Sequence, residues 1–180
     1  MKKLLLIVFI IGFTATLNAQ GLGIGPVLGY QKAQDAEEGS LLGGGAVRMK
    51  LNKSFGVEGA ILYRSEEYAD GNVKVTNYPV MVTGLIYPLP IVYGAIGAGW
   101  YNTKIEYNYD GVGLFEPKDE TSQEFGWHFG GGVELPVGNN IKLTGDIRYV
   151  FIDYDFDQTP TSDEIDNDFF VIDVGLLFGL

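Results

Sequence analysis

The segment that decides the fold reads FGVEGAILYR and occupies residues 55–64 of the 180-residue sequence. Its bulky side chains stand at alternate positions, and the residues between them are mostly small or charged. A period of two is that of a β-strand, whose successive side chains point to opposite faces. One face of this strand therefore carries Phe55, Val57, Ile61 and Tyr63, and the other carries Gly56, Glu58, Ala60, Leu62 and Arg64.

The same alternation recurs along the chain in both directions. It is clear over residues 41–51, 125–135, 141–151 and 169–180, and it is less regular near residues 21–31, 74–86 and 91–103. Helical spacing is absent from these segments. Together with residues 55–64, they predict eight strands.

The connections between the predicted strands alternate in length. Residues 52–54, 87–90 and 136–140 form short turns rich in Asn, Pro and Gly; residues 32–39, 66–73, 104–122 and 153–167 are long and polar. Short turns at one end and long loops at the other are typical of an up-and-down barrel in a bacterial outer membrane. We therefore predict an all-β fold, an eight-stranded antiparallel up-and-down transmembrane barrel.

The composition of the two strand faces indicates which one meets lipid. The polar face is dominated by Gly, Ala and Leu with few charges, which suits the narrow interior of a small barrel. The apolar face carries aromatic residues near both strand ends, which predicts the aromatic girdles of a membrane barrel. The rings expected in these girdles are Tyr30, Tyr63, Tyr78, Trp100, Phe125, Phe151 and Phe170 near the loops, and Phe55, Tyr87 and Phe178 near the turns.

The N-terminus has the pattern of a secretory signal peptide. Lys2 and Lys3 precede an unbroken apolar run over residues 4–13, and small and polar residues follow up to residue 20. The run has about half of the roughly 20 residues that a membrane-spanning helix requires. We expect residues 1–19 to be a cleaved signal peptide and residues 20–180 to be the barrel domain.

Composition and motifs exclude several classes of function. The chain has no cysteine, a formal net charge of −11 and no cluster of basic residues beyond its first three positions, which argues against disulfide scaffolds and nucleic-acid partners. No dinucleotide-binding or phosphate-binding glycine motif occurs among its 26 glycines, so no cofactor is expected. The single histidine, His128, lies on the predicted inner face with Glu134, where a hydrogen-bonding role is expected rather than catalysis. We expect no enzymatic activity.

Charged residues on the predicted inner face are balanced in sign. Five basic residues (Arg48, Lys50, Arg64, Lys142 and Arg148) accompany five acidic ones (Glu58, Glu124, Glu134, Asp146 and Asp173). Unpaired charges would be costly in a poorly hydrated lumen, so pairing is expected, with Asp146 or Glu134 as the partner of Arg148. The predicted structural network comprises Arg48, Glu58, Arg64, His128, Glu134, Lys142, Asp146, Arg148 and Asp173. The alternative role for these pairs is a gate that exchanges partners and opens a small pore.

The long loops are strongly acidic. The long loops and the strand ends next to them hold 18 acidic residues and four lysines, not counting the residues of the predicted inner face. This gives a net charge of −14 on one side of the membrane. The densest group lies between Asp153 and Asp168. Clustered carboxylates are calcium ligands, although this run lacks the spacing and glycine of an EF-hand. Divalent cations, alone or bridging to lipopolysaccharide, are therefore candidate partners, and solvation of the loops is the alternative.

Several segments resemble a known family. They combine glycine with aromatic residues: Tyr78 to Val80, Tyr93 to Tyr101, Phe125 to Leu135, Arg148 with Tyr149, and Val174 to Phe178. In these segments the chain resembles the small outer membrane beta-barrel proteins, which include porin-like and outer membrane protein A-like barrels. It departs from them at its last residue, Leu180, where that family usually has phenylalanine. The resemblance implies an integral protein of the cell outer membrane, often structural or adhesive, and implies no substrate.

These observations predict a monomeric outer-membrane barrel with a structural or surface-interaction role of the adhesion type. Its expected partners are outer-membrane lipid and lipopolysaccharide and the barrel insertion machinery. Two alternatives stay open: a narrow channel or carrier for small or hydrophobic solutes, and a secreted soluble ligand-binding barrel of the lipocalin type.

Overall fold

The computed structural model describes residues 21–33, 39–68, 72–107, 120–152 and 168–180. The predicted signal peptide at residues 1–19 lies outside the described residues, as does most of the acidic run between Asp153 and Asp168. Within the described segments no helix has the length and apolarity of a membrane span. These segments form nine strands: β1 Leu22–Ala33, β2 Ser40–Lys50, β3 Phe55–Tyr68, β4 Val73–Asn77, β5 Val80–Leu89, β6 Val92–Tyr107, β7 Glu120–Pro136, β8 Ile141–Ile152 and β9 Phe169–Gly179.

The strands form one closed antiparallel barrel. Apart from β4 and β5, which do not pair with each other, consecutive strands pair, and β9 pairs with β1 to close the ring. Strands β4 and β5 both lie between β3 and β6, so they are two parts of a single crossing, interrupted at Tyr78 and Pro79. Proline cannot donate a ladder hydrogen bond, which explains the break at this point. The barrel thus has the predicted eight crossings, although its regular strands number nine.

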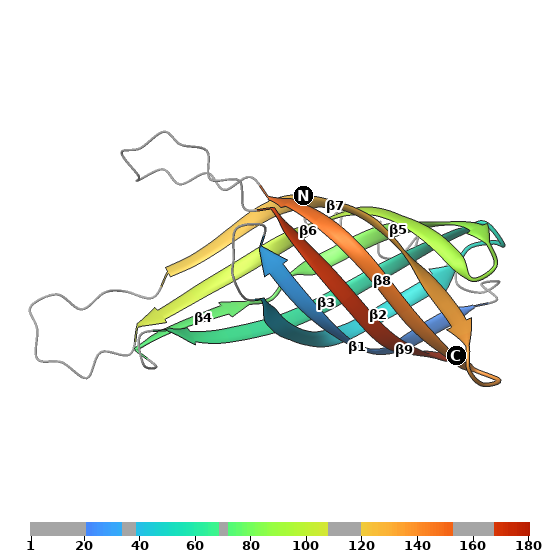
Figure 1. Cartoon of the computed structure of the whole chain (residues 1–180), viewed down its shortest axis with the longest axis horizontal. Helices are drawn as coiled ribbons and strands as arrows, with labels where there is room; N and C mark the ends of the chain where they lie inside the picture. The colour runs from blue at the N-terminus through green and yellow to red at the C-terminus, as the bar shows by residue number, and fades with distance from the viewer. Residues whose placement is uncertain (1–20, 34–38, 69–71, 108–119, 153–167) are drawn as a thin grey trace, which may run out of the picture.

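The two ends of the barrel differ as the loop lengths predict. The short connections β2–β3, β5–β6 and β7–β8 and the C-terminus lie at the right end of Figure 1, and the long connections start from the left end. Strands β3, β4, β6 and β7 reach furthest to the left, beyond the rest of the barrel. The right end is called the turn end below, and the left end the loop end.

Side chains alternate between lumen and outer surface in the predicted phase. In β9 the residues from Phe169 to Leu177 alternate strictly between buried and exposed. Large apolar side chains cover the outside of the barrel, as Leu41 shows with 79% of its surface exposed. Continuous exposed apolar surface marks a membrane or protein interface, whereas a soluble barrel turns its apolar face inward. The outward apolar face therefore belongs to a membrane barrel and not to one of the lipocalin type.

One of the predicted girdle residues lies on the opposite face. Tyr87 points into the lumen and is only 4% exposed, whereas the other nine predicted rings lie on the outer surface. Strand β5 carries apolar side chains on both faces, so its sequence does not reveal the phase of its alternation. The structure sets that phase by pairing Val82 with Gly59 and Ala98, which places Met81, Thr83, Leu85 and Tyr87 inside.

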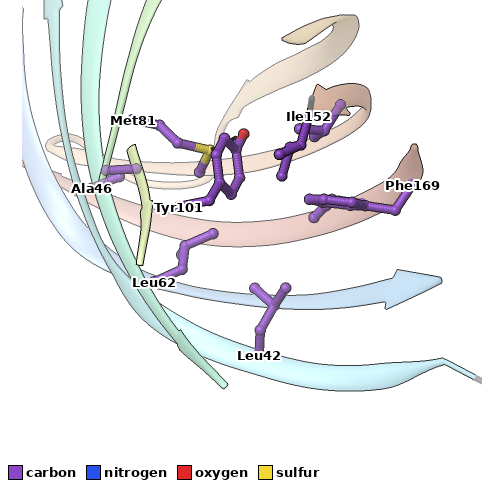
Figure 2. Close-up of a cluster of buried hydrophobic side chains, with 10 residues drawn as sticks. Leu42, Ala46, Leu62, Met81, Tyr101, Ile152 and Phe169 are labelled. Atoms are coloured by element: carbon purple, nitrogen blue, oxygen red, sulfur yellow. Dashed lines mark hydrogen bonds between the residues drawn. The ribbon is translucent and has the colours of Figure 1, made fainter. Parts of the chain in front are cut away.

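The half of the lumen nearer the loop end is filled by apolar side chains. Figure 2 shows Leu42, Leu62, Tyr101, Ile152 and Phe169 converging from the inner faces of five strands. The Tyr101 and Phe169 rings meet edge to face, with their centroids 5.9 Å apart. The complete cluster is Leu42, Ala46, Ala60, Leu62, Met81, Tyr101, Val150, Ile152, Phe169 and Val171. This apolar cluster closes the lumen near the loop end, and the buried charged residues Arg48, Glu58, Glu134, Asp146 and Arg148 lie between it and the turn end.

Candidate functional site

Charged side chains from four strands meet in the middle of the lumen. Arg48 comes from β2, Glu58 from β3, Glu134 from β7, and Asp146 with Arg148 from β8; all five are buried. Arg48 and Glu58 are directly opposite in the β2–β3 register, so their side chains start close together on the same face. All five lie on the lumen faces of their strands, so their side chains point into the barrel.

Glu58 joins the two buried arginines. Its Oε2 accepts a 2.8 Å hydrogen bond from Arg48 Nε, and its Oε1 accepts one of 2.6 Å from Arg148 Nη2. Arg148 Nε also donates to Asp146 Oδ1 at 2.7 Å. Two arginines and two carboxylates thus form a chain that crosses the lumen from β2 and β3 to β8. Of the two alternative partners predicted for Arg148, the structure has Asp146, and Glu58 is its second partner.

Glu134 binds the cations nearer the turn end. Its Oε1 lies 2.8 Å from Lys50 Nζ and 3.0 Å from Lys142 Nζ. Its Oε2 accepts hydrogen bonds from the Tyr87 hydroxyl at 2.9 Å and from Arg48 Nη1 at 3.2 Å. Arg48 therefore bridges the two carboxylates Glu58 and Glu134, and the network continues to the turn end of the lumen.

Three uncharged side chains extend the network and were not predicted to belong to it. The Tyr93 hydroxyl donates to Asp146 Oδ2 at 2.7 Å and accepts from Arg48 Nη2 at 3.1 Å. Thr83 Oγ1 lies 2.8 Å from His128 Nε2 and accepts from Arg148 Nη1 at 3.3 Å. Tyr87 is the third. All three belong to β5 and β6, where the alternation of apolar and polar residues is least regular. The sequence therefore does not show which residues of these two strands face the lumen.

His128 has the hydrogen-bonding position expected of it. Its side chain is almost completely buried and lies over Gly97 on the neighbouring strand β6. A Cβ atom at Gly97 would stand 2.5 Å from His128 Nε2, so glycine is needed there for the ring to fit. Among the described residues, no group of three His, Asp or Glu side chains could hold a metal ion.

Three predicted lumen residues stand apart from the network. Arg64 is half-buried at the loop end of β3, and its Nε has no hydrogen-bond partner in the described part of the chain. Glu124 accepts a hydrogen bond from Ser122 on its own strand, also near the loop end. Asp173 is buried opposite Asp146 in the β8–β9 register, and its Oδ1 is unpartnered among the same residues. Arg64 and Glu124 are too far along their strands to reach the centre.

Little free space remains between the charged network and the apolar cluster. The cavity that separates them, bordered by Glu58, Asp146, Arg148 and Asp173 on one side and Leu62 and Met81 on the other, measures about 10 Å³. A water molecule needs roughly 10–15 Å³, so one water fills such a space. The described residues thus close the lumen twice, first with apolar side chains and then with ion pairs.

Comparison with known proteins gives one family and several solved structures. The sequence model of the outer membrane protein beta-barrel domain matches residues 4–178. Neisserial surface protein A is 13% identical, with a TM-score of 0.59 over 91% of this chain and 99% of that one. A major outer membrane protein from Thermus thermophilus is 13% identical, with a TM-score of 0.61 over 87% and 98% of the two chains.

A third similar structure is Ail, the attachment invasion locus protein of Yersinia pestis, in complex with the heparin analogue sucrose octasulfate. It is 18% identical, with a TM-score of 0.52 over 88% of this chain and 95% of that one. At these identities the likeness to the three structures concerns the fold alone. A search of curated proteins found no match.

Proposed function

Because this chain belongs to the outer membrane protein beta-barrel domain family, we propose that it serves the cell outer membrane as a closed barrel with a structural or surface-interaction role. The observation that carries this proposal is the double closure of the lumen. A channel needs a continuous polar path, and here an apolar cluster follows an ion-pair network along the axis. Catalysis is not part of the proposed function, since the buried His128 and Thr83 have no opening to a substrate.

The acidic loops support a role in surface interaction and indicate the charge of a partner. The 18 acidic residues and four lysines of the loop end repel polyanions and attract cations. A sulfated ligand such as the one in the Ail complex would therefore be disfavoured here. The partners that this surface favours are basic protein surfaces and divalent cations, including cations shared with lipopolysaccharide. Lipid around the apolar face and the barrel insertion machinery remain proposed partners.

The purified barrel should conduct little or no ionic current in a planar lipid bilayer. The lumen of an eight-stranded barrel is just wide enough for its own side chains, and here these leave a cavity of about 10 Å³ at the level of the network. Single-channel recording tests this directly. Steady and large conductance would contradict the proposed role and favour the alternative of a narrow channel.

The loop end should face the outside of the cell. A cysteine at Asn72, which is exposed beside the β3–β4 connection, should react with an impermeant thiol reagent on intact cells. A cysteine at Asn139, exposed in the β7–β8 turn, should react only after the outer membrane is permeabilised. Since the natural sequence has no cysteine, each variant carries a single reporter. The reverse labelling pattern would show that the barrel is inserted in the opposite orientation.

A further inference from the structure

The turn end of the lumen contains a cavity that plays no part in the closure of the barrel described above. It measures about 280 Å³ and is lined by Lys50, Lys142 and Glu134, with Arg48 at its inner end. Apolar walls are supplied by Leu22, Ile141, Leu177 and Leu180. A water molecule takes about 30 Å³ in the liquid, so the cavity has room for about nine waters or one small organic molecule. The ion-pair network ends the cavity on its inner side, so a ligand that enters cannot pass through.

The two lysines leave hydrogen-bonding capacity unused. Both ammonium groups contact the same carboxylate oxygen, Glu134 Oε1, at 2.8 and 3.0 Å. An ammonium group has three N–H donors, and neither lysine uses more than one on Glu134. Lys50 lies in addition 4.1 Å from the centre of the Tyr87 ring. The lysine side chains are 21% and 36% exposed, so both remain accessible from the cavity.

The charges around the cavity do not balance. Lys50 and Lys142 bring two positive charges, and Glu134 brings one negative charge. Deeper in the lumen, Arg48 and Arg148 accompany three buried carboxylates, Glu58, Asp146 and Asp173, so the lumen as a whole is balanced and the excess is local to its turn end. The charged side chains at the mouth of the lumen therefore leave one local positive charge, which a single negative charge would neutralise. A dianion would exceed this excess.

From this geometry we propose that the turn end of the barrel binds an organic monocarboxylate of about dipeptide size, such as the C-terminus of a short peptide. The carboxylate lies between the ammonium groups of Lys50 and Lys142, and small apolar groups contact Leu22, Ile141 and Leu177. Charge selects a monoanion, and the apolar walls select a ligand with side chains over a bare ion. This site is independent of the proposed surface role, because it opens at the opposite end of the barrel.

Titration of the intact barrel in zwitterionic lipid nanodiscs tests the proposal. The probe is N-acetyl-alanyl-alanine, followed by NMR through the backbone amides of Gly138, Asn139 and Gly179, which line the cavity. We expect saturable shifts of these amides and about tenfold weaker binding of the matched C-terminal amide, since a hydrogen bond to a charged group contributes roughly 1.5–3 kcal/mol. Equal affinity for the acid and the amide would overturn the proposal.

Two simpler ions separate the chemical classes. Acetate carries the charge without the apolar part, so it should shift the same amides but bind more weakly than the peptide. Inorganic phosphate should bind no more tightly than acetate, because the site has a single excess positive charge. Tighter binding of phosphate would identify a phosphate site and overturn the monocarboxylate assignment. Equally tight binding of acetate and the peptide would show that the apolar walls do not contribute to binding, which would overturn the assignment of a peptide-sized ligand.

Variants assign the binding to the lysines. Lys142→Met should weaken peptide binding about tenfold, whereas Lys142→Arg, which keeps the charge, should largely retain it. The matched control is Lys53→Met, because Lys53 is exposed in the neighbouring β2–β3 turn and does not line the cavity. Unchanged affinity in a folded Lys142→Met barrel would overturn the proposal. If that variant does not fold, the affinities of the natural protein for the peptide acid and for its C-terminal amide still test the proposal.

Discussion

Replacing Arg148 with alanine should lower the free energy of unfolding of the barrel by about 3–5 kcal/mol, the usual cost of removing one partner of a buried ion pair. Arg148 contacts Glu58 Oε1 at 2.6 Å and Asp146 Oδ1 at 2.7 Å, and it donates to Thr83. Its removal leaves both carboxylates with fewer donors in a space that water barely enters. Water that follows the lost side chain into the lumen should soften the cost toward the lower value.

Urea unfolding in lipid vesicles measures this change. Trp100 and Trp127 are exposed on the outer surface, so their fluorescence reports the loss of lipid contact when the barrel unfolds. Arg64→Ala is the matched control: Arg64 is half-buried at the loop end, belongs to no described ion pair and should contribute little. The Arg148→Ala barrel should also show small, flickering conductance where the natural barrel shows none. A variant indistinguishable from the natural protein in both assays would show that the network neither stabilises nor seals the barrel.

The fold could be predicted from the sequence because each strand in a narrow barrel has two different environments. In β7 the lumen residues between Gly126 and Glu134 are small or polar and the large apolar side chains face lipid, so the alternation is visible in the chain. In β3, β8 and β9 the charged residues and glycines on the lumen side keep the contrast, although each of these strands also turns one or more apolar side chains inward. In β5 the lumen side carries Met81, Leu85 and Tyr87, which resemble lipid-facing residues. Apolar filling of the lumen removes the contrast, and for this reason the pattern does not reveal the face of Tyr87.

The sequence predicts which charged residues face the lumen, but it does not predict which of them pair with each other. Alternation gives the face of a residue, whereas the height of a residue along the barrel depends on the register and tilt of every strand between it and its partner. Arg48 and Glu58 meet across one ladder, which a sequence pattern can suggest. Glu58 and Arg148 are 90 positions apart and meet across the lumen, which requires the closed barrel. Arg64 shares the face of the network but stands too near the loop end to join it.

Introducing a lysine at Ile147 should test most directly which surface of the barrel meets lipid. Ile147 is central in β8, points outward and is 50% exposed, with Gly131 and Ile172 as its neighbours across the two ladders. Glycine on one side leaves room for a longer side chain, so steric strain should contribute little. A lysine near the bilayer midplane should lower the free energy of unfolding in vesicles by about 2–4 kcal/mol, because the charge loses its hydration in hydrocarbon.

A lysine at Val137 is the matched control for depth. Val137 is also apolar and is 57% exposed, but it lies in the β7–β8 turn, where the membrane meets water. There the same change should cost only about 0–1 kcal/mol, since the ammonium group remains hydrated. The difference between the two variants isolates the effect of depth from the effect of losing an apolar side chain. Small and equal costs at the two positions would mean that the outer face of β8 does not cross hydrocarbon, which would contradict a membrane barrel despite its apolar surface.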